Sequence, residues 1–431
     1  MLHVIQQQLE RNAKVSAWTI KEDRSRSKEL FFIQNKLDMN RAVDALEYHV
    51  CIYVDFEEDE TRYKGDANIL ISASDSEQEI ASKIEKAVFA AGFVKNKWYD
   101  LPEDVGDSIP GLPLFDNVTD LKERYDELYD VLFKSYPYRS NINSCEIFAT
   151  TAEQRIVTSK GCDITYPRNH WMFELVTDDN KGKEPVEIFN DYDLTNMDLE
   201  QIESIVDRQL METEGRSLAV RNEKIESIRI ILTGDSVESL LEFYVTQATD
   251  QMIYSNISRV KKGERFIVEE AKQSLTVTMN PELSFSIHSK PVDEEGRRLK
   301  PYVLFRDGVA ENIRSSARYS HYLGIAHTGM VQPFEVEAGD RPIDDYRTGN
   351  YLELIAFSSF NMDSMSGDFG GEFRLGKLVQ NGQIFWVTGG AISENIFDVQ
   401  DRMVFTARQI RRKKSLTPEA IIIDGVTVSG I

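Results

Sequence analysis

The chain has 431 residues, of which 41% are hydrophobic and 28% are charged. This length predicts two or three domains, and the composition excludes general disorder. The 72 acidic and 50 basic residues give a formal net charge of -22, which argues against direct contact with nucleic-acid phosphates or anionic membranes.

The cysteines and the start of the chain indicate where the protein is located. Cys51, Cys145 and Cys162 contain no CxxC pair, so we expect neither a disulfide framework nor a thiolate zinc site. The opening residues lack the charged start and apolar core of a secretion signal, and no apolar run reaches about 18 residues. We therefore expect a cytoplasmic protein.

Residues 1–100 are expected to form an α+β domain. A short amphipathic helix should precede extended segments at 17–20 and 30–34 and a hairpin of strands at 48–56 and 64–72. The apolar face of a second helix then recurs at helical spacing, at Ile80, Ile84, Ala87, Val88 and Ala91. We expect Ser74 or Asp75 to cap this helix and Gly92 to end it in a left-handed conformation.

The segment 101–116 is rich in proline and glycine, and we predict a linker there. A middle α+β domain should follow at 117–222, beginning with a helix that Thr119 caps. Short strands are expected between Ser144 and Phe189, with turns at 152–154 and 160–161, and then a polar helix at 197–212. This pattern favours an antiparallel sheet with helices on one side.

Residues 223–431 read as a β-rich C-terminal domain. A buried strand at 228–232 leads into a heavily apolar helix that begins near 233–236, and short strands with glycine turns follow. The basic run 408–414 is expected to be a solvated surface. The predicted fold class is α+β, with mostly antiparallel sheets and flanking helices.

Several short segments of this third region together resemble a known family, although no single segment is specific enough to identify it. In chain order they are Pro291–Gly296 (PVDEEG), Tyr302–Gly308 (YVLFRDG), Ser316–Gly324 (SARYSHYLG), Ser366–Phe369 (SGDF), Leu378–Ile384 (LVQNGQI), Val387–Asp398 (VTGGAISENIFD) and Ala420–Gly430 (AIIIDGVTVSG). Their order and spacing resemble the TldD/PmbA family. The resemblance implies a peptidase assembly that pairs a metal-bearing with a metal-lacking subunit.

The residues that would hold the metal are missing from this chain. The metal-bearing subunits of the resembled family use HExxxH on the helix that opens the third domain, together with a cysteine near the C-terminus. Zinc hydrolysis needs about three protein ligands and a carboxylate that takes the proton of the bound water. Here the equivalent helix, 237–248, has no histidine, and no cysteine follows Cys162. We therefore predict no catalytic residues and no cofactor.

Three further sets of residues are weaker candidate sites. Glu238 and Glu242 lie one turn apart and more simply form an acidic helix edge than a cation site. His321 and His327 are weak metal candidates, because a spacing of six suits neither one helical face nor one side of a strand. The glycine-rich segment Ser366, Gly367, Asp368, Phe369, Gly370 and Gly371 predicts a turn or bulge, and it is also a candidate for close approach of a substrate backbone.

Three functions remain open. The first is a zinc-lacking subunit that, with an HExxxH-bearing TldD-like partner, acts on peptides or unfolded proteins. The second is a stand-alone homodimer that binds peptides or acts as a scaffold. The third is an independent metallohydrolase that uses His321, His327 and the carboxylates of Asp340, Asp344 and Asp345. The older description of the resembled family as a modulator of DNA gyrase implies, at this net charge, an indirect link.

Overall fold

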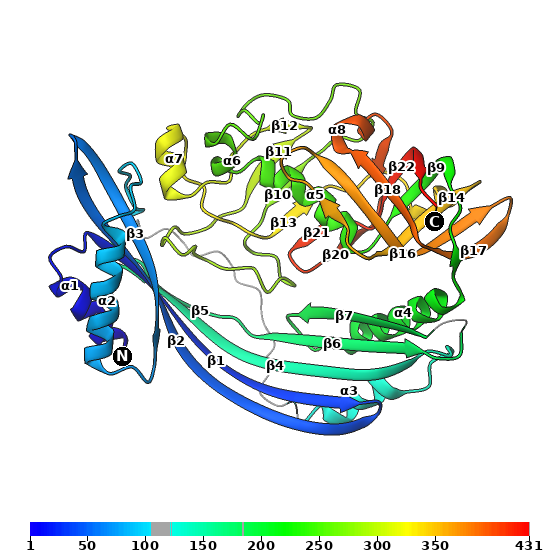
Figure 1. Cartoon of the computed structure of the whole chain (residues 1–431), viewed down its shortest axis with the longest axis horizontal. Helices are drawn as coiled ribbons and strands as arrows, with labels where there is room; N and C mark the ends of the chain where they lie inside the picture. The colour runs from blue at the N-terminus through cyan, green and yellow to red at the C-terminus, as the bar shows by residue number, and fades with distance from the viewer. Residues whose placement is uncertain (105–120, 122, 183–184, 431) are drawn as a thin grey trace.

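The computed structural model describes residues 1–104, 121, 123–182 and 185–430. Over these ranges the fold is α+β, as predicted, and the strands form three sheets. Figure 1 shows a long bowed sheet along one side of the molecule, with the third region packed above it. Among the helices of the described ranges, none is both long and apolar enough to cross a membrane.

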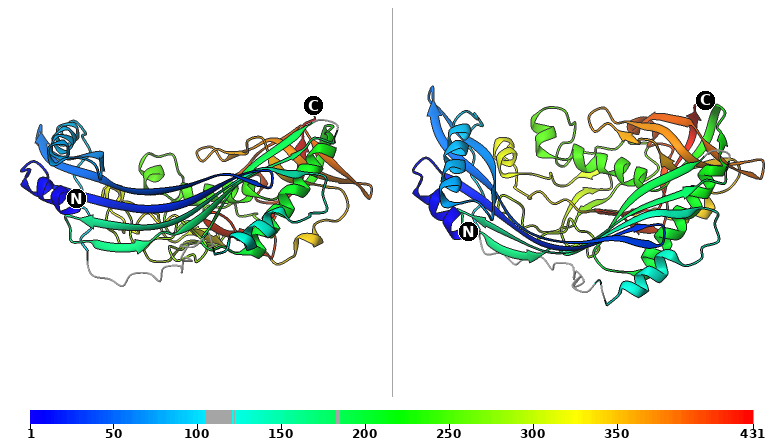
Figure 2. Two further views of the ribbon diagram at one scale, coloured as in Figure 1. Left: turned by 90° about the horizontal axis from the view of Figure 1, so that it is seen from below. Right: turned by 60° about the horizontal axis from the view of Figure 1, so that its bottom comes forward.

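The bowed sheet is antiparallel throughout and draws its strands from both of the first two expected domains. In spatial order it contains β3 (Thr61–Ser72), β2 (Lys36–Glu58), β1 (Ala17–Ile33), β4 (Asn141–Thr158), β6 (His170–Asp179) and β7 (Val186–Leu194). The short strand β5 (Asp163–Pro167) pairs with β4. Figure 2 shows how the long central strands curve along the molecule.

Two long strands of this sheet, β1 and β2, exceed the short segments predicted for them. β1 has 17 residues and β2 has 23. The polar stretch in the middle of β1, KEDRSRSKE, stays extended because it is hydrogen-bonded to β2 on one edge and to β4 on the other. Pairing on both edges therefore overrides the polar composition of the segment.

Helices cover the two ends of the bowed sheet. At one end α1 (Leu2–Arg11) and α2 (Glu77–Ala91) share a core with strands β1 to β3. At the other end α3 (Tyr125–Phe133) and α4 (Leu199–Leu218) pack against β1, β4 and β6. The predicted linker residues 105–116 and the predicted cap Thr119 lie outside the described residues.

The N-cap predicted for α2 is wrong by one or two residues. Ser76 is the cap, because its Oγ accepts a hydrogen bond from Glu79 N at 3.3 Å while the Glu79 carboxylate accepts one from Ser76 N at 2.8 Å. This reciprocal arrangement satisfies two free helix donors at once. Asp75 instead accepts a hydrogen bond from Ser72 N at 2.8 Å.

Two turn predictions are also wrong. Gly92 has a φ of -63°, in the right-handed region, because the chain leaves α2 through a tight turn in which Phe93 N donates to Ala90 O. Residues 152–154 are not a turn but the middle of β4, where they pair with β1 and, in part, with β5. The turn predicted at 160–161 is confirmed, with a φ of 96° at Gly161.

The third region contains two mixed sheets. The first has the order β12 (Val309–Ala310), β11 (Tyr302–Arg306), β10 (Val277–Met279), β13 (Phe334–Val336), β21 (Ser415–Pro418), β20 (Gln409–Arg411). The second has the order β19 (Met403–Phe405), β22 (Ile421–Val428), β9 (Ile225–Leu232), β14 (Tyr351–Phe357), β16 (Asp368–Gln380), β17 (Gln383–Thr388), β8 (Val220–Arg221), with β15 (Asn361–Met362) and β18 (Gly390–Asn395) also paired to β16.

The helices of the third region are α5 (Asp235–Gln247), α6 (Asp250–Tyr254), α7 (Ala317–Leu323), the 3-10 helix η2 (Ile343–Asp345) and α8 (Ile396–Val399). The strand predicted at 228–232 and the apolar helix after it are confirmed as β9 and α5. Side chains of α5 belong to one continuous core with strands of both mixed sheets. This core places α5 at the centre of the region.

Candidate functional site

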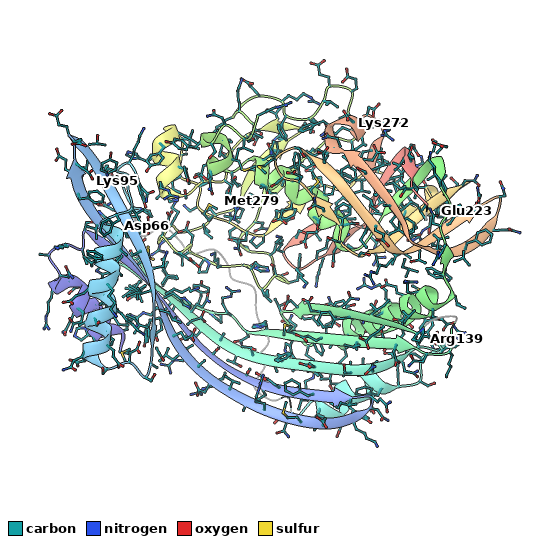
Figure 3. The ribbon with its side chains drawn as sticks, viewed as in Figure 1. Asp66, Lys95, Arg139, Glu223, Lys272 and Met279 are labelled. Atoms are coloured by element: carbon teal, nitrogen blue, oxygen red, sulfur yellow. The ribbon has the colours of Figure 1, made fainter. Side chains whose placement is uncertain are left out.

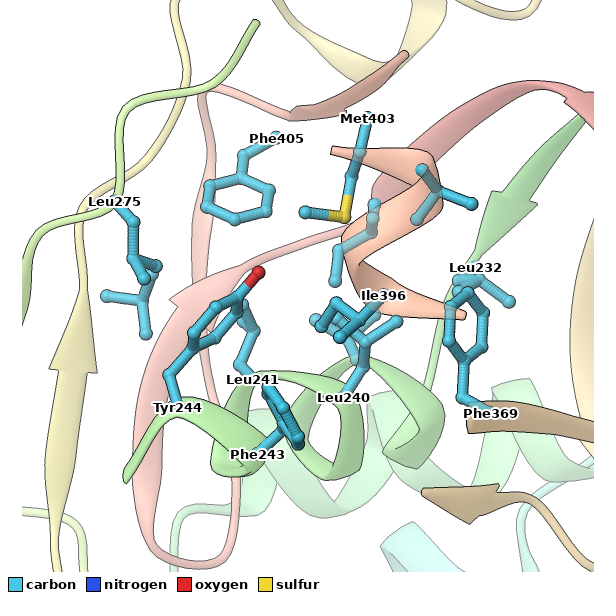
Figure 4. Close-up of a cluster of buried hydrophobic side chains, with 14 of the residues drawn as sticks. Leu232, Leu240, Leu241, Phe243, Tyr244, Leu275, Phe369, Ile396, Met403 and Phe405 are labelled. Atoms are coloured by element: carbon cyan, nitrogen blue, oxygen red, sulfur yellow. The ribbon is translucent and has the colours of Figure 1, made fainter. Parts of the chain in front are cut away.

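The helix that the resemblance makes equivalent to the expected HExxxH helix is α5. A turn at Gly234, with a φ of 66°, leads from β9 into this helix. Its side chains Leu240, Leu241 and Phe243 are at most 2% exposed, and they meet apolar side chains of neighbouring elements (Figure 4). Tyr244 is also buried, and its hydroxyl accepts a hydrogen bond from Gln400 Nε2 at 2.9 Å. The buried face of α5 therefore offers packing and no nitrogen or sulfur ligand for zinc.

The two carboxylates of α5 are bound to the chain itself. Glu238 Oε1 accepts a hydrogen bond from Ser415 Oγ at 2.5 Å, and Glu242 Oε1 lies 2.6 Å from Lys414 Nζ. These contacts tie α5 to the start of β21 and to the residue before it. Both glutamates thus have partners within the chain and do not form the solvated edge that was expected, and neither joins a potential metal-binding group of the described residues.

The basic run 408–414 is a solvated surface only in part: Arg408, Gln409 and Arg411 are exposed as predicted, whereas residues 412–414 are half-buried. Arg412 Nη1 donates to the Gly234 carbonyl oxygen at 2.5 Å, and burial lowers the pKa of Arg412 to about 10. Lys413 forms an ion pair with Asp191 of β7. The run therefore joins the turn before α5 to the bowed sheet, because its long side chains reach partners on both.

The glycine-rich segment leads from a turn into the start of β16. Gly367 has a φ of 85°, whereas 368–371 are already strand. A Cβ atom at Gly370 would lie 2.1 Å from the Ile392 carbonyl oxygen, and one at Gly371 would lie 2.1 Å from the Ser359 carbonyl oxygen. The chain's own backbone fills the space beside these two glycines.

The exposed part of the same segment is polar. The Ser366 hydroxyl donates to Asp368 Oδ2 at 2.8 Å, and Asn395 Nδ2 donates to Asp368 Oδ1 at 2.8 Å. These hydrogen bonds lower the pKa of Asp368. Phe369 is buried. Substrate contact by this segment stays a prediction, and Ser366 and Asp368 are the side chains that face solvent for it.

The two histidines named as weak metal candidates lie in different surroundings. His321 is exposed on α7, with its ring edge-on to Trp98 at 5.7 Å between centroids. His327 is half-buried beyond α7 and forms a group with Asp293 and Glu295. In the part of the chain that the structure describes, these three residues place one ligand atom each within 4.8 Å of one another, and His321 is not among them.

The aspartates suggested as partners of the histidines are engaged elsewhere. Asp344 Oδ1 accepts a hydrogen bond from Arg347 Nη1 at 3.0 Å, and Asp345 Oδ2 accepts one from Arg341 Nε at 3.1 Å. Within the described residues, neither these two nor Asp340 joins a potential metal-binding group. The structure thus brings His327 to different carboxylates from those named for the hydrolase hypothesis.

The group of Asp293, Glu295 and His327 has the donor atoms for a divalent transition metal. Burial, and then the positive charge of Arg297, lower the pKa of His327 to about 4, so its imidazole is neutral at pH 7 and can act as a ligand. His327 Nε2 lies 3.6 Å from Glu295 Oε2. The alternative role of the group is structural, because Asp293 already accepts hydrogen bonds from the backbone N–H groups of residues 295, 297 and 330.

A cavity of about 280 Å³ lies next to this group, where the bowed sheet meets α6 and α7. Its lining comes from β2, β3, the segment before the linker, α6, the PVDEEG loop and α7. The lining residues are Tyr53, Asp66, Tyr99, Asp250, Gln251, Glu295, Ser316, Arg318, Tyr319 and Met330. Sequence reasoning did not identify this cavity, because its lining residues come from segments far apart in the chain that only the fold brings together.

A pH effect on stability is expected from Glu295. Its burial, and then the Asp293 carboxylate, raise the pKa of Glu295 from near 4.5 to about 7. The folded state therefore holds this proton more tightly than the unfolded state, so the stability contribution is complete below about pH 4.5 and is lost as the pH rises through 7. We expect the melting temperature to fall less between pH 5 and pH 8 for Glu295→Gln than for the unmodified chain. The exposed Glu10→Gln variant serves as control, and parallel melting curves for all three proteins would contradict the assignment.

Comparison with known proteins identifies the third region. Residues 225–430 match the family described as the PmbA/TldA metallopeptidase C-terminal domain. The resemblance predicted from the sequence is therefore confirmed. A search of curated protein sequences finds no match.

Solved structures extend the similarity to the whole chain. TldE from Thermococcus kodakarensis has a TM-score of 0.75 at 16% identity, covering 100% of both chains. Proposed modulators of DNA gyrase from Thermotoga maritima and Bacteroides thetaiotaomicron have TM-scores of 0.75 and 0.79 at 13% and 15% identity. These alignments cover 100% of this chain and 100% and 99% of the respective structures. Identities this low establish a common fold and nothing further.

Proposed function

Because its C-terminal half belongs to the PmbA/TldD metallopeptidase family, we propose that this chain is the zinc-lacking subunit of a TldD/TldE-like peptidase complex. In this proposal the chain supplies structure and substrate contacts, and a partner subunit with HExxxH supplies the metal. The substrates are peptides or unfolded proteins. The similarity in fold to a protein named TldE supports this assignment.

A single observation carries the proposal, namely the composition of α5. The helix offers apolar and aromatic side chains to the core, and its two glutamates contact Ser415 and Lys414. A hydrolytic zinc ion needs about three ligands and an open position for water. Placing such an ion on α5 would require the loss of its buried packing and of both glutamate contacts.

The proposal is tested by mixing two purified proteins. We expect this chain alone to cleave no peptide, and we expect cleavage to appear or to increase at least tenfold when it is added to an HExxxH-bearing relative. Chelation of the relative's metal should abolish that activity. Cleavage by this chain alone, lost in the His327→Ala variant, would instead support the independent metallohydrolase, for which the group at Asp293, Glu295 and His327 is the relevant observation.

A further inference from the structure

The cavity between the bowed sheet and the helices α6 and α7 carries more negative than positive charge. Asp66, Asp250 and Glu295 line it, with Arg318 as its one lining cation. Arg318 donates to Asn96 Oδ1 at 3.0 Å and to the Tyr319 hydroxyl at 3.2 Å. Figure 3 labels Asp66, which lies on β3. Among the described residues, no lysine or arginine comes within ion-pair distance of the three carboxylates.

The hydrogen-bond donors around these carboxylates are neutral groups. Asp250 is 2% exposed, and it accepts hydrogen bonds from Ser316 N at 2.7 Å, Ser316 Oγ at 2.9 Å and Gln251 N at 2.7 Å. Asp66 Oδ1 accepts a hydrogen bond from Asn96 Nδ2 at 2.7 Å. Arg318 acts electrostatically on Asp66 and Glu295 without forming an ion pair with either. With one lining cation against three carboxylates, the cavity keeps an excess of negative over positive lining groups.

The rest of the lining suits an organic cation. Tyr53 and Tyr99 are 6% and 3% exposed, and Tyr319 lines the same space. Cations of the chain already lie over two of these rings, with Lys64 Nζ 5.8 Å from the Tyr99 centroid and Arg318 Cζ 4.6 Å from the Tyr319 centroid. Faces of aromatic rings attract ammonium groups, and the attraction grows when water is excluded. An ammonium group also offers N–H donors in three directions, which suits acceptors that lie apart around a cavity.

The arrangement does not suit a bare metal ion. A metal ion needs ligand atoms that converge on one point, and the potential metal-binding group of the described residues contains Glu295 but neither Asp66 nor Asp250. A volume of about 280 Å³ also exceeds what a single ion fills and approaches that of a small-molecule site. An organic cation of a few atoms matches both the size and the spread of the carboxylates.

We propose that this cavity binds a primary ammonium group, which Asp66, Asp250 and Glu295 neutralise and the tyrosines enclose. The choice of a peptide as the carrier of this group rests on the proposed function. A peptide offers two such groups, its free N-terminus and the lysine side chain. The cavity is then a place where this subunit recognises substrate away from α5.

The proposal is tested by titrating the full chain with three short peptides that all end in a C-terminal amide. One has a free N-terminus and no lysine, the second is N-acetylated without lysine, and the third is N-acetylated with one lysine. We expect the acetylated peptide without lysine to bind at least tenfold more weakly than the first. If the acetylated peptide with lysine binds tightly, the cavity accepts any primary ammonium group. If it binds weakly, the cavity is specific for the N-terminal amine. Equal affinity for all three peptides would overturn the proposal.

Variants locate the binding. Asp66→Asn removes one negative charge and keeps an oxygen that can accept the hydrogen bond from Asn96, so the fold should persist while affinity for the free-amine peptide falls about tenfold. Asp44→Asn, on the exposed part of β2, is the control and should bind as the unmodified chain does. Unchanged affinity in Asp66→Asn would overturn the proposed site.

The outcomes separate this inference from the proposed function. Peptide titration needs no partner subunit, whereas the mixing experiment measures cleavage. Amine-dependent binding without any effect on a partner's activity would retain the cavity assignment and reject the zinc-lacking subunit. If the chain activates a partner but binds peptides with and without a free amine equally well, the zinc-lacking subunit is retained and the cavity assignment is rejected.

Discussion

Phe243→Ala is expected to lower the free energy of unfolding by about 3–5 kcal/mol, in the range measured for large-to-small changes in well-packed cores. Phe243 is 2% exposed, and its ring contacts Tyr244, Phe266 and Phe397 at centroid distances of 5.5 to 6.3 Å. Removal of the ring leaves a cavity beside α5, the helix whose composition carries the proposed function. Chemical denaturation of the two proteins measures the difference.

A matched control comes from a phenylalanine on another helix. Phe89 of α2 is 72% exposed, and its ring contacts Phe93. Because little apolar area leaves water at this position on folding, Phe89→Ala should change the unfolding free energy by no more than about 0.5 kcal/mol. If both variants lost the same stability, the account of α5 as a packing element would be wrong.

Arg298→Ala is expected to lower the free energy of unfolding by about 2–4 kcal/mol, which lies toward the lower end of the range for breaking a buried ion pair. Arg298 donates from Nε and Nη2 to the two carboxylate oxygens of Asp104 at 2.8 and 2.9 Å. The side chains are 17% and 11% exposed, so the variant leaves the Asp104 charge largely desolvated. This ion pair joins the PVDEEG loop region to the segment that follows the first domain.

The exposed ion pair of Arg26 and Asp44 provides the comparison. It has a similar length, 3.0 Å, but its side chains are 69% and 64% exposed. Surface pairs of this kind contribute about 0–1 kcal/mol, so Arg26→Ala should have little effect in the same denaturation experiment. An Arg298→Ala variant as stable as Arg26→Ala would show that the contact with Asp104 does not hold the two parts together.

Local patterns predicted the elements whose packing follows from their own residues. The apolar faces of α2 and α5 recur at helical spacing, and β9 is a short continuous apolar run, so each could be identified in isolation. The family resemblance was also visible, because it depends on the order of motifs along the chain. The absence of histidine from α5 followed from the sequence directly.

Features that depend on distant partners could not be predicted in this way. The polar middle of β1 is a strand because β2 and β4 pair with it. The local sequence around Arg26 on β1, or around its partner Asp44 on β2, does not indicate this pairing. The close approach of the Ile392 and Ser359 backbone to Gly370 and Gly371 also depends on distant segments, so the sequence could not show it. The cavity likewise joins residues from several elements, and its charge imbalance exists only after folding.

The zinc content of the purified chain tests the central claim most directly. Elemental analysis is made on the unmodified protein and on His327→Ala, which removes one member of the group at Asp293, Glu295 and His327. The account predicts that the His327→Ala protein holds well below one equivalent of zinc after dialysis, because α5 supplies no suitable set of ligands. One equivalent retained in that variant, and lost when Glu238 and Glu242 are both replaced by glutamine, would place a metal on α5 and contradict the account.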